Sequence, residues 1–320
     1  MPGIAKRMVN YFSRTVRRMA RGKLRREMDA LYSLLYHVVH DLDASPSLAA
    51  VQTRVAFTRQ WQQLKAGQYL LSDPWFKDNV ARILCEQEIQ VQPDWFIGKD
   101  VLDAGCGNGR WSYGLAKLGA HVTALDASPV AIEETRHALA EFTTPKYFAV
   151  TPLENLSKAL PQEKRFDLVF CWGVAHHCQR FNQVLDELTR LVKDGGLLYL
   201  YLYGRDSLSF HQDLALFKER VAYNSLPTEE DQYAFLLARA GGDPNKVHNL
   251  HDIFAPLINR RFTFEQIQAM LEPRGLSRIE RTLEHSELFI RASKGDPAGV
   301  ERWLLPRAKP PYWFQHHEAA

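Results

Sequence analysis

A glycine-rich segment near residue 100 combines residue types that suit ligand binding. It reads Val101-Leu102-Asp103-Ala104-Gly105-Cys106-Gly107-Asn108-Gly109-Arg110. Glycines at alternate positions let the chain turn sharply out of a strand and bring its backbone against a ligand, with the N-terminus of the next helix nearby. Asp103 precedes the first glycine by two residues, where its carboxylate can meet a cationic amino group. Because the spacing is GxGxG and the dinucleotide fingerprint is GxGxxG, the turn disfavours a dehydrogenase.

A second carboxylate lies at Asp126, seventeen residues after Gly109 and at the end of the next predicted strand. A carboxylate at that edge of a sheet can accept hydrogen bonds from both hydroxyls of a ribose. Asp126 therefore indicates an adenosine-containing ligand without choosing among such ligands. The alternative is that Asp126 caps the N-terminus of the following helix.

Two adjacent histidines, His176 and His177, follow a predicted apolar strand at the sheet edge where ligands bind. They are the candidates for a general base if the reaction needs one. The alternative is structural, with one ring packed under a ligand and the other hydrogen-bonded to a loop. The four cysteines form no CxxC pair and no cluster with zinc spacing, so we predict reduced thiols and no metal site: Cys85, Cys106, Cys171 and Cys178.

The elements that position these residues alternate between strand and helix from residue 99 onward. Short apolar strands are predicted at 101–103, 121–126, 147–150, 166–172 and 197–203, with helices at 109–118, 129–142 and 180–192. After a break, a helix at 263–272 and strands near 276–283 and 286–292 follow. Strands that are apolar throughout and alternate with helices indicate a parallel sheet covered on both faces, which is the α/β class.

Three further segments surround this core. Residues 1–98 are predicted to be helical, with an apolar stripe over residues 31–39 and helix starts at Pro46 and Pro74. Residues 205–262 are predicted to form a mostly helical insertion that serves as a substrate lid, and residues 295–320 an irregular tail. The predicted cofactor-binding domain therefore comprises residues 99–204 and 263–294.

Charge is distributed unevenly along the chain. The whole chain carries +3, yet residues 1–30 hold nine Lys or Arg and two acids, a local charge of +7, so the remainder is slightly acidic. Such a basic segment suits RNA, an anionic membrane surface or an acidic partner, and the alternative is a solvated helix. No run approaches the roughly 18 apolar residues of a membrane span, and no secretory signal is recognisable, so we predict a cytoplasmic protein.

The glycine-rich segment and its continuation, VLDAGCGNGRWSYGLAKLGAHVTALDASPVAI, resemble the opening of class I S-adenosylmethionine-dependent methyltransferases. The segments FDLVFCWGVAHHC and LTRLVKDGGLLYLYLY are similar to the fourth-strand motif and the fifth-strand entry of that family. The resemblance covers residues 99–204 and, more loosely, 263–293. It implies a Rossmann-like, seven-stranded sheet with five parallel strands and a terminal antiparallel hairpin.

The same resemblance implies a site for S-adenosylmethionine, whose product is S-adenosylhomocysteine. Asp103 would face its amino group, Asp126 with Ala127 would hold the ribose, and backbone around Cys171 and Trp172 would line its methionine side. The turn that packs against the cofactor would comprise Gly105, Cys106, Gly107, Asn108 and Gly109. One position departs from the family, because Pro152 stands where many relatives have an acid for the adenine amino group. The adenine contacts expected here are therefore the Leu153 backbone and Glu154, the nearest acid.

Candidates for contact with the acceptor come from the N-terminal helices and from the insertion with its entrance: Trp61, Tyr69, Tyr203, His211 and His251. We expect methyl transfer by in-line displacement to a small or medium-sized acceptor, such as a natural-product, glycan or lipid-linked intermediate. Two alternatives stay open. One is an RNA (tRNA) methyltransferase that uses the basic N-terminal segment, and the other is a non-catalytic binding protein that keeps the cofactor fold.

Overall fold

The computed structural model describes residues 19–20, 22–23, 48–64 and 71–315. The chain divides into two compact units, residues 1–47 and 48–320, and the second unit contains the sheet. Several predicted features lie outside the described residues: most of the basic segment 1–30, the stripe at 31–39, the helix start at Pro46, and Tyr69.

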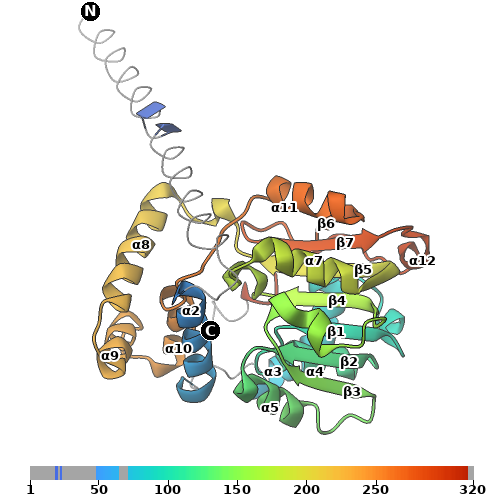
Figure 1. Cartoon of the computed structure of the whole chain (residues 1–320), viewed down its shortest axis with the longest axis horizontal. Helices are drawn as coiled ribbons and strands as arrows, with labels where there is room; N and C mark the ends of the chain where they lie inside the picture. Colours follow the sequence, from blue (N-terminus) through green and yellow to red (C-terminus); the bar gives the residue numbers. More distant parts are fainter. Residues whose placement is uncertain (1–18, 21, 24–47, 65–70, 316–320) are drawn as a thin grey trace, which may run out of the picture. The chain divides into compact units, whose positions relative to one another are not determined.

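The second unit is built on one seven-stranded sheet with the order β3-β2-β1-β4-β5-β7-β6 (Figure 1). The first five strands pair in parallel, and β7 runs antiparallel to both β5 and β6. This arrangement confirms the predicted fold class. The strands are β1 Asp100–Ala104, β2 His121–Asp126, β3 Lys146–Val150, β4 Phe166–Trp172, β5 Val192–Leu202, β6 Leu276–Arg281 and β7 Leu288–Lys294.

Helices connect and cover the strands. Those that alternate with the strands are α4 Arg110–Lys117, α5 Pro129–Ala138, α6 Leu156–Ala159, α7 Phe181–Leu191 and α11 Phe264–Leu271. Those that precede the sheet or lie in the insertion are α2 Leu48–Gln63, α3 Pro74–Ile83, α8 Phe210–Asn224, α9 Glu229–Arg239 and α10 Val247–Phe254.

The alternation of side chains along each strand builds two cores. Val101 faces one core with α3, α4 and α5, whereas Leu102 faces the other with α7 and α11. Neighbouring residues of a strand point to opposite faces of the sheet, so an entirely apolar strand must be covered on both sides. The sheet is consequently the middle of three layers (Figure 1).

Two segments differ in detail from the predictions. The helix predicted to start at Pro74 is α-helical only to Ile83 and continues as a π-helical turn, Leu84–Glu88, in which the Ile89 N–H donates to the Leu84 carbonyl at 2.8 Å. The tail is largely irregular apart from the short helix α12, Ala298–Glu301, but it is not a loose end, since Tyr312 and Trp313 are buried. The tail is anchored by apolar packing. The sequence does not predict this packing, because an irregular segment has no periodic pattern of apolar residues.

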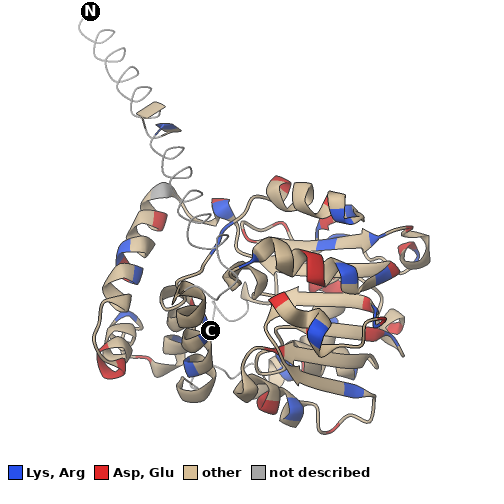
Figure 2. Ribbon diagram, viewed as in Figure 1, with Lys and Arg blue, Asp and Glu red and all other residues tan. Residues whose placement is uncertain are grey.

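Helices α8, α9 and α10 of the insertion pack with α2 into a helical layer beside the sheet (Figure 1). Tyr223, Leu236 and Phe254 of α8, α9 and α10 share a buried cluster with Ala56 of α2. Of these helices, α2 carries arginines and no acid, whereas the three acids at the start of α9 stand out in Figure 2. Across the described residues, no helix is both long and apolar enough to cross a membrane.

Candidate functional site

The glycine turn joins β1 to α4 along a left-handed backbone path. Gly105, Gly107 and Gly109 have φ angles of +87°, +56° and +82°, which L-residues with side chains rarely adopt. Neighbouring elements also pack so closely against these glycines that there is no room for a side chain. A Cβ built on Gly105 would lie 2.5 Å from a Val174 methyl, and one on Gly109 would lie 2.8 Å from the Thr135 Cα. The sequence motif therefore reflects both backbone conformation and close packing.

Asp103 stands at the carboxyl end of β1 and is buried. The Ser112 hydroxyl donates to its Oδ2 at 2.6 Å. Burial raises the pKa of this carboxyl to about 7, a change that the Ser112 hydrogen bond and the Arg110 charge oppose. A cationic ligand group beside Asp103 would favour its charged form.

Asp126 ends β2, the neighbouring strand. Its Oδ2 accepts from the Gly107 N–H at 3.0 Å, and its Oδ1 accepts from the Ser128 N–H at 2.8 Å. Burial raises its pKa while these backbone donors lower it. The N-cap of α5 is Ser128 and not Asp126. Because a carboxylate offers about four acceptor positions, Asp126 holds the turn and keeps lone pairs for a ligand.

Aromatic residues form a wall at the carboxyl ends of β4 and β5. Trp172 stacks on Tyr201 with ring centroids 4.3 Å apart. The Arg110 guanidinium also lies over the Trp172 ring, 4.6 Å from its centroid. The strand order reverses between β1 and β4, and this is the place where ligands bind in open α/β sheets.

Glu88, at the end of the π-helical turn, connects this wall to the tail. It is fully buried and accepts hydrogen bonds from the Trp172 Nε1 at 3.2 Å, from the Tyr199 hydroxyl and from the Trp313 Nε1. Burial raises the pKa of Glu88 to about 7, while the three donors lower it. The Glu88 carboxyl thereby holds the indole of Trp172 in place through its Nε1–H group.

The two candidate catalytic histidines lie in the short turn Ala175–His177 after β4, and both are buried. His177 Nδ1 is 2.8 Å from the Ile258 carbonyl, and burial lowers its pKa to about 3. Neither ring nitrogen of His176 meets a hydrogen-bond partner among the described residues, and its ring lies 4.0 Å from that of Tyr203. Burial also lowers the pKa of His176, so both rings are neutral and His177 anchors the insertion.

Tyr203 extends the aromatic wall toward the insertion. Its hydroxyl donates to Asp252 Oδ2 of α10 at 3.0 Å. Burial raises the pKa of Asp252, and this hydrogen bond lowers it. The four cysteines are unpaired thiols, and burial raises the pKa of Cys171 to about 12. In the part of the chain that the structure describes, no group of three or more His, Cys, Asp or Glu is placed to hold a metal ion.

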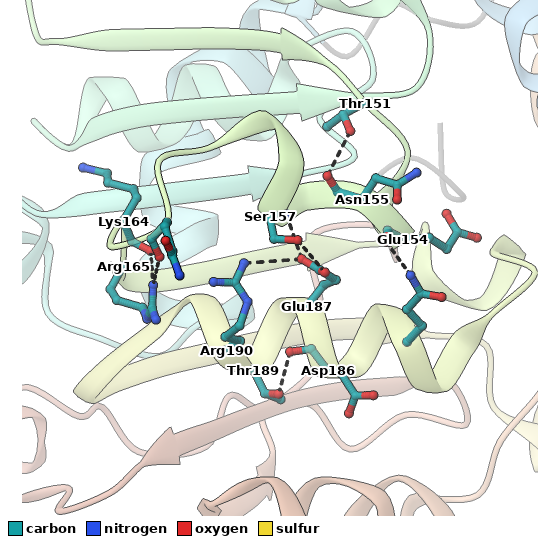
Figure 3. A network of polar contacts seen from close by, with 12 residues as sticks. Thr151, Glu154, Asn155, Ser157, Lys164, Arg165, Asp186, Glu187, Thr189 and Arg190 are labelled. Atoms are coloured by element: carbon teal, nitrogen blue, oxygen red, sulfur yellow. Dashed lines mark hydrogen bonds and ion pairs between the residues drawn. The ribbon is translucent and has the colours of Figure 1, made fainter.

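The segment expected to meet adenine is held by a polar network (Figure 3). Leu153 is buried in the turn after β3, and Glu154 Oε1 accepts from the Gln179 N–H at 3.1 Å. Its carbonyl accepts from Gln183 of α7 at 2.8 Å. Nearby, Ser157 donates through both N–H and hydroxyl to Glu187 at 2.8 and 2.7 Å. Glu154 is therefore turned toward the chain after β4.

The candidate acceptor residues separate in space. Trp61 of α2 covers the glycine turn, because its Cζ2 lies 2.9 Å from a Cβ built on Gly107. His251 instead bridges helices, with its ring nitrogens 3.0 Å from the Tyr223 hydroxyl and 3.0 Å from the Ala56 carbonyl. His211 is exposed on α8. The described geometry thus groups Trp61 and Tyr203 with the site and leaves His251 and His211 in the helical layer.

Two residues of the site were missed by the sequence analysis. Arg110 enters the sequence analysis only as the end of the glycine motif. The available signal is its place in the first turn of a helix, where a cation is unfavourable. Glu88 is not singled out from the sequence, because it lies within a segment that is predicted to be helical throughout. The sequence does contain a sign of its burial: Glu88 comes four residues after Leu84, so in a helix it would lie on the same face as the apolar residues.

The comparisons with known proteins concern the core of this site. Residues 101–196 match the family model described as a methyltransferase domain. The chain is 33% identical over 118 residues to the ubiquinone biosynthesis O-methyltransferase of Proteus mirabilis, covering 37% of this chain and 47% of the relative. It is 33% identical over 141 residues to the mitochondrial ubiquinone biosynthesis O-methyltransferase of Schizosaccharomyces pombe, covering 41% and 47%. The chain thus spans about half the length of these curated relatives.

Solved structures also align with the chain at low identity. The 1,6-didemethyltoxoflavin-N1-methyltransferase of Burkholderia thailandensis is 18% identical with a TM-score of 0.49, covering 79% of this chain and 92% of that one. The magnesium protoporphyrin IX methyltransferase of Synechocystis PCC 6803 is 17% identical with a TM-score of 0.46, covering 79% and 100%.

Proposed function

We propose that this chain, in which residues 101–196 form a class I methyltransferase domain, transfers a methyl group from S-adenosylmethionine to a hydroxyl of a small or medium-sized acceptor. The observation that carries the proposal is the glycine turn, whose glycines have left-handed backbone conformations, flanked at adjacent strand ends by the buried carboxyl of Asp103 and the partly buried carboxyl of Asp126. The O-methyltransferase names of the similar proteins favour oxygen as the acceptor atom.

The residues present fit this cofactor. Asp103 is a buried carboxyl without a cation in contact among the described residues, and it suits an ammonium group. Asp126 retains acceptor positions for ribose hydroxyls besides those taken by backbone N–H groups. The glycines let backbone approach a ligand without interference from side chains. The cofactor supplies an electrophilic methyl group on a sulfonium.

The chain's own residues then have to orient the nucleophile and exclude water. Trp61 covers Gly107, and the Trp172–Tyr201 stack lies at the carboxyl ends of β4 and β5. We assign Trp61 and Tyr203 to the acceptor, and their rings favour a ligand with an aromatic or other planar ring. With a pKa of about 3, His177 is a weak base, so we assign it to anchoring the Ile258 loop and not to proton transfer.

The first test is calorimetric titration of the protein with S-adenosylmethionine, S-adenosylhomocysteine and NAD. We expect micromolar binding of both sulfur ligands and no heat with NAD. Binding of NAD alone would identify the turn as a dehydrogenase site. If none of the three binds to folded protein, the chain is a binding protein that has lost the cofactor.

Replacing Asp126 by asparagine should weaken S-adenosylhomocysteine binding about tenfold to a hundredfold, equivalent to the roughly 1.5–3 kcal/mol of hydrogen bonds to a charged group. The matched control is Asp100→Asn at the opposite end of the parallel strands, which should leave affinity unchanged. Titration calorimetry at constant pH measures both. Equal affinities for wild type and Asp126→Asn would remove Asp126 from the site.

A further inference from the structure

Arg110 opens α4 directly after the glycine turn, and its guanidinium has no polar partner among the described residues. The group lies 4.6 Å from the Trp172 centroid and 5.6 Å from the Trp111 centroid. The Arg110 N–H donates to Asn108 Oδ1 at 3.3 Å, but no hydrogen bond or ion pair reaches the guanidinium from residues 48–64 or 71–315. The contact with the face of the Trp172 indole therefore holds the guanidinium in place and leaves its N–H donors for a ligand.

Nearby acids do not take up this cation. Asp252, Glu88 and Asp103 act on Arg110 through space and raise its pKa, against the larger opposite effect of burial. Each acid is already engaged elsewhere: Asp252 by Tyr203, Asp103 by Ser112, and Glu88 by three donors. The acids thus offset part of the cost of burying the charged guanidinium without closing it into a salt bridge.

The helix gives a second reason to expect an anion here. α4 spans 8 residues, and its first turn contains Arg110 but no acid. The N-terminus of a helix disfavours a cation and favours a carboxylate or phosphate, whose oxygens can accept from the open N–H groups. A bound anion would satisfy both the helix and the guanidinium.

We infer that Arg110 binds the α-carboxylate of S-adenosylmethionine while Asp103 receives its α-ammonium group. The inference rests on the proposed function and deepens it. The amino-acid end of the cofactor is a zwitterion, and the two side chains supply the complementary pair on either side of the glycine turn. Their mutual attraction is evident without a ligand, since Arg110 lowers the pKa of Asp103.

The test compares two ligands that differ only in this carboxylate, S-adenosylmethionine and its decarboxylated form. Dissociation constants are measured by calorimetry for wild type, Arg110→Met and Arg110→Lys. Arg110→Met keeps an apolar stem against Trp172 and removes the charge. We expect it to weaken S-adenosylmethionine binding about tenfold to a hundredfold and to leave binding of the decarboxylated ligand unchanged or tighter. Arg110→Lys should fall between, because a point charge lacks the bidentate geometry.

Lys117→Met, at the last residue of the same helix, is the matched control and should change neither constant. Thermal melts verify that each variant is folded. An equal loss for both ligands in Arg110→Met would assign Arg110 to holding the turn and would overturn the inference, as would an unchanged preference for the carboxylate. A wild-type protein that binds neither ligand would instead sink the proposed function.

Discussion

Glu88→Ala should lower the free energy of unfolding by about 3 kcal/mol or more at pH 5. The substitution leaves the donors of Trp172, Tyr199 and Trp313 without an acceptor in the core, and each buried unsatisfied donor costs about 1–3 kcal/mol. At pH 5 the carboxyl is protonated, because its pKa is about 7, so relief of a buried charge does not offset the loss. Urea denaturation followed by tryptophan fluorescence measures the effect.

Glu88→Gln isolates the titration of the same group. Since burial raises the folded pKa from 4.5 to about 7, the folded state holds this proton more tightly than the unfolded state does. The stabilisation is fully present below about pH 4.5 and is lost as the pH rises through about 7. Between pH 5 and pH 8 the wild type should therefore lose about 2 kcal/mol that Glu88→Gln does not lose. Other titrating groups are common to both proteins and cancel in the difference.

The matched control for this experiment is Glu86→Gln, an exposed acid two residues earlier that pairs with Arg82. It should retain the wild-type difference between pH 5 and pH 8. If Glu88→Gln retains that difference as well, Glu88 is not the group that titrates in the core.

Gly109→Ala should cost about 3 kcal/mol of stability and weaken S-adenosylhomocysteine binding by more than tenfold. The left-handed conformation costs an alanine about 1–2 kcal/mol, and the new Cβ would meet the Thr135 Cα at 2.8 Å, an overpacking that typically costs about 1–3 kcal/mol. Because a backbone atom cannot rotate away, the turn itself has to move. Asp126, which accepts from the Gly107 N–H, would lose its alignment with the turn.

Gly98→Ala separates the two contributions. Gly98 also has a positive φ, +70°, but a Cβ there would meet nothing within 4 Å. Its alanine variant should show the conformational cost alone, about 1–2 kcal/mol, and unchanged affinity for S-adenosylhomocysteine. Chemical denaturation and calorimetry of the two variants decide the matter. Equal losses of stability in Gly109→Ala and Gly98→Ala would show that the structure relaxes around the Thr135 contact at no measurable cost.

Much of the candidate site was predictable because its parts are adjacent in sequence. Asp103, the glycines and α4 follow one another within fifteen residues, and Asp126 ends the very next strand. The alternation of strands and helices predicted a covered parallel sheet. The helices begin and end within a few residues of the predicted positions, because local hydrogen bonds decide those boundaries. The exception is the π-helical turn Leu84–Glu88.

Contacts between segments that lie far apart in the chain could not be predicted from the sequence. Trp313 meets Glu88 across 225 positions, and Trp61 reaches Gly107 from a helix outside the motif. Nothing in the periodicity of an irregular tail indicates that it closes on the core. Likewise, Trp172 and Tyr201 come together only because β4 and β5 pair in one register.

The sequence by itself thus determined the sheet, the glycine turn and the two carboxylates, since backbone conformation and strand periodicity are local properties of neighbouring residues. Only the tertiary structure decided that Arg110 lies on Trp172 without a polar partner among the described residues, that Glu88 holds that tryptophan from behind, and that His177 bonds a carbonyl of the insertion. Those roles depend on burial and on partners far along the chain, which side-chain packing selects after the elements have formed.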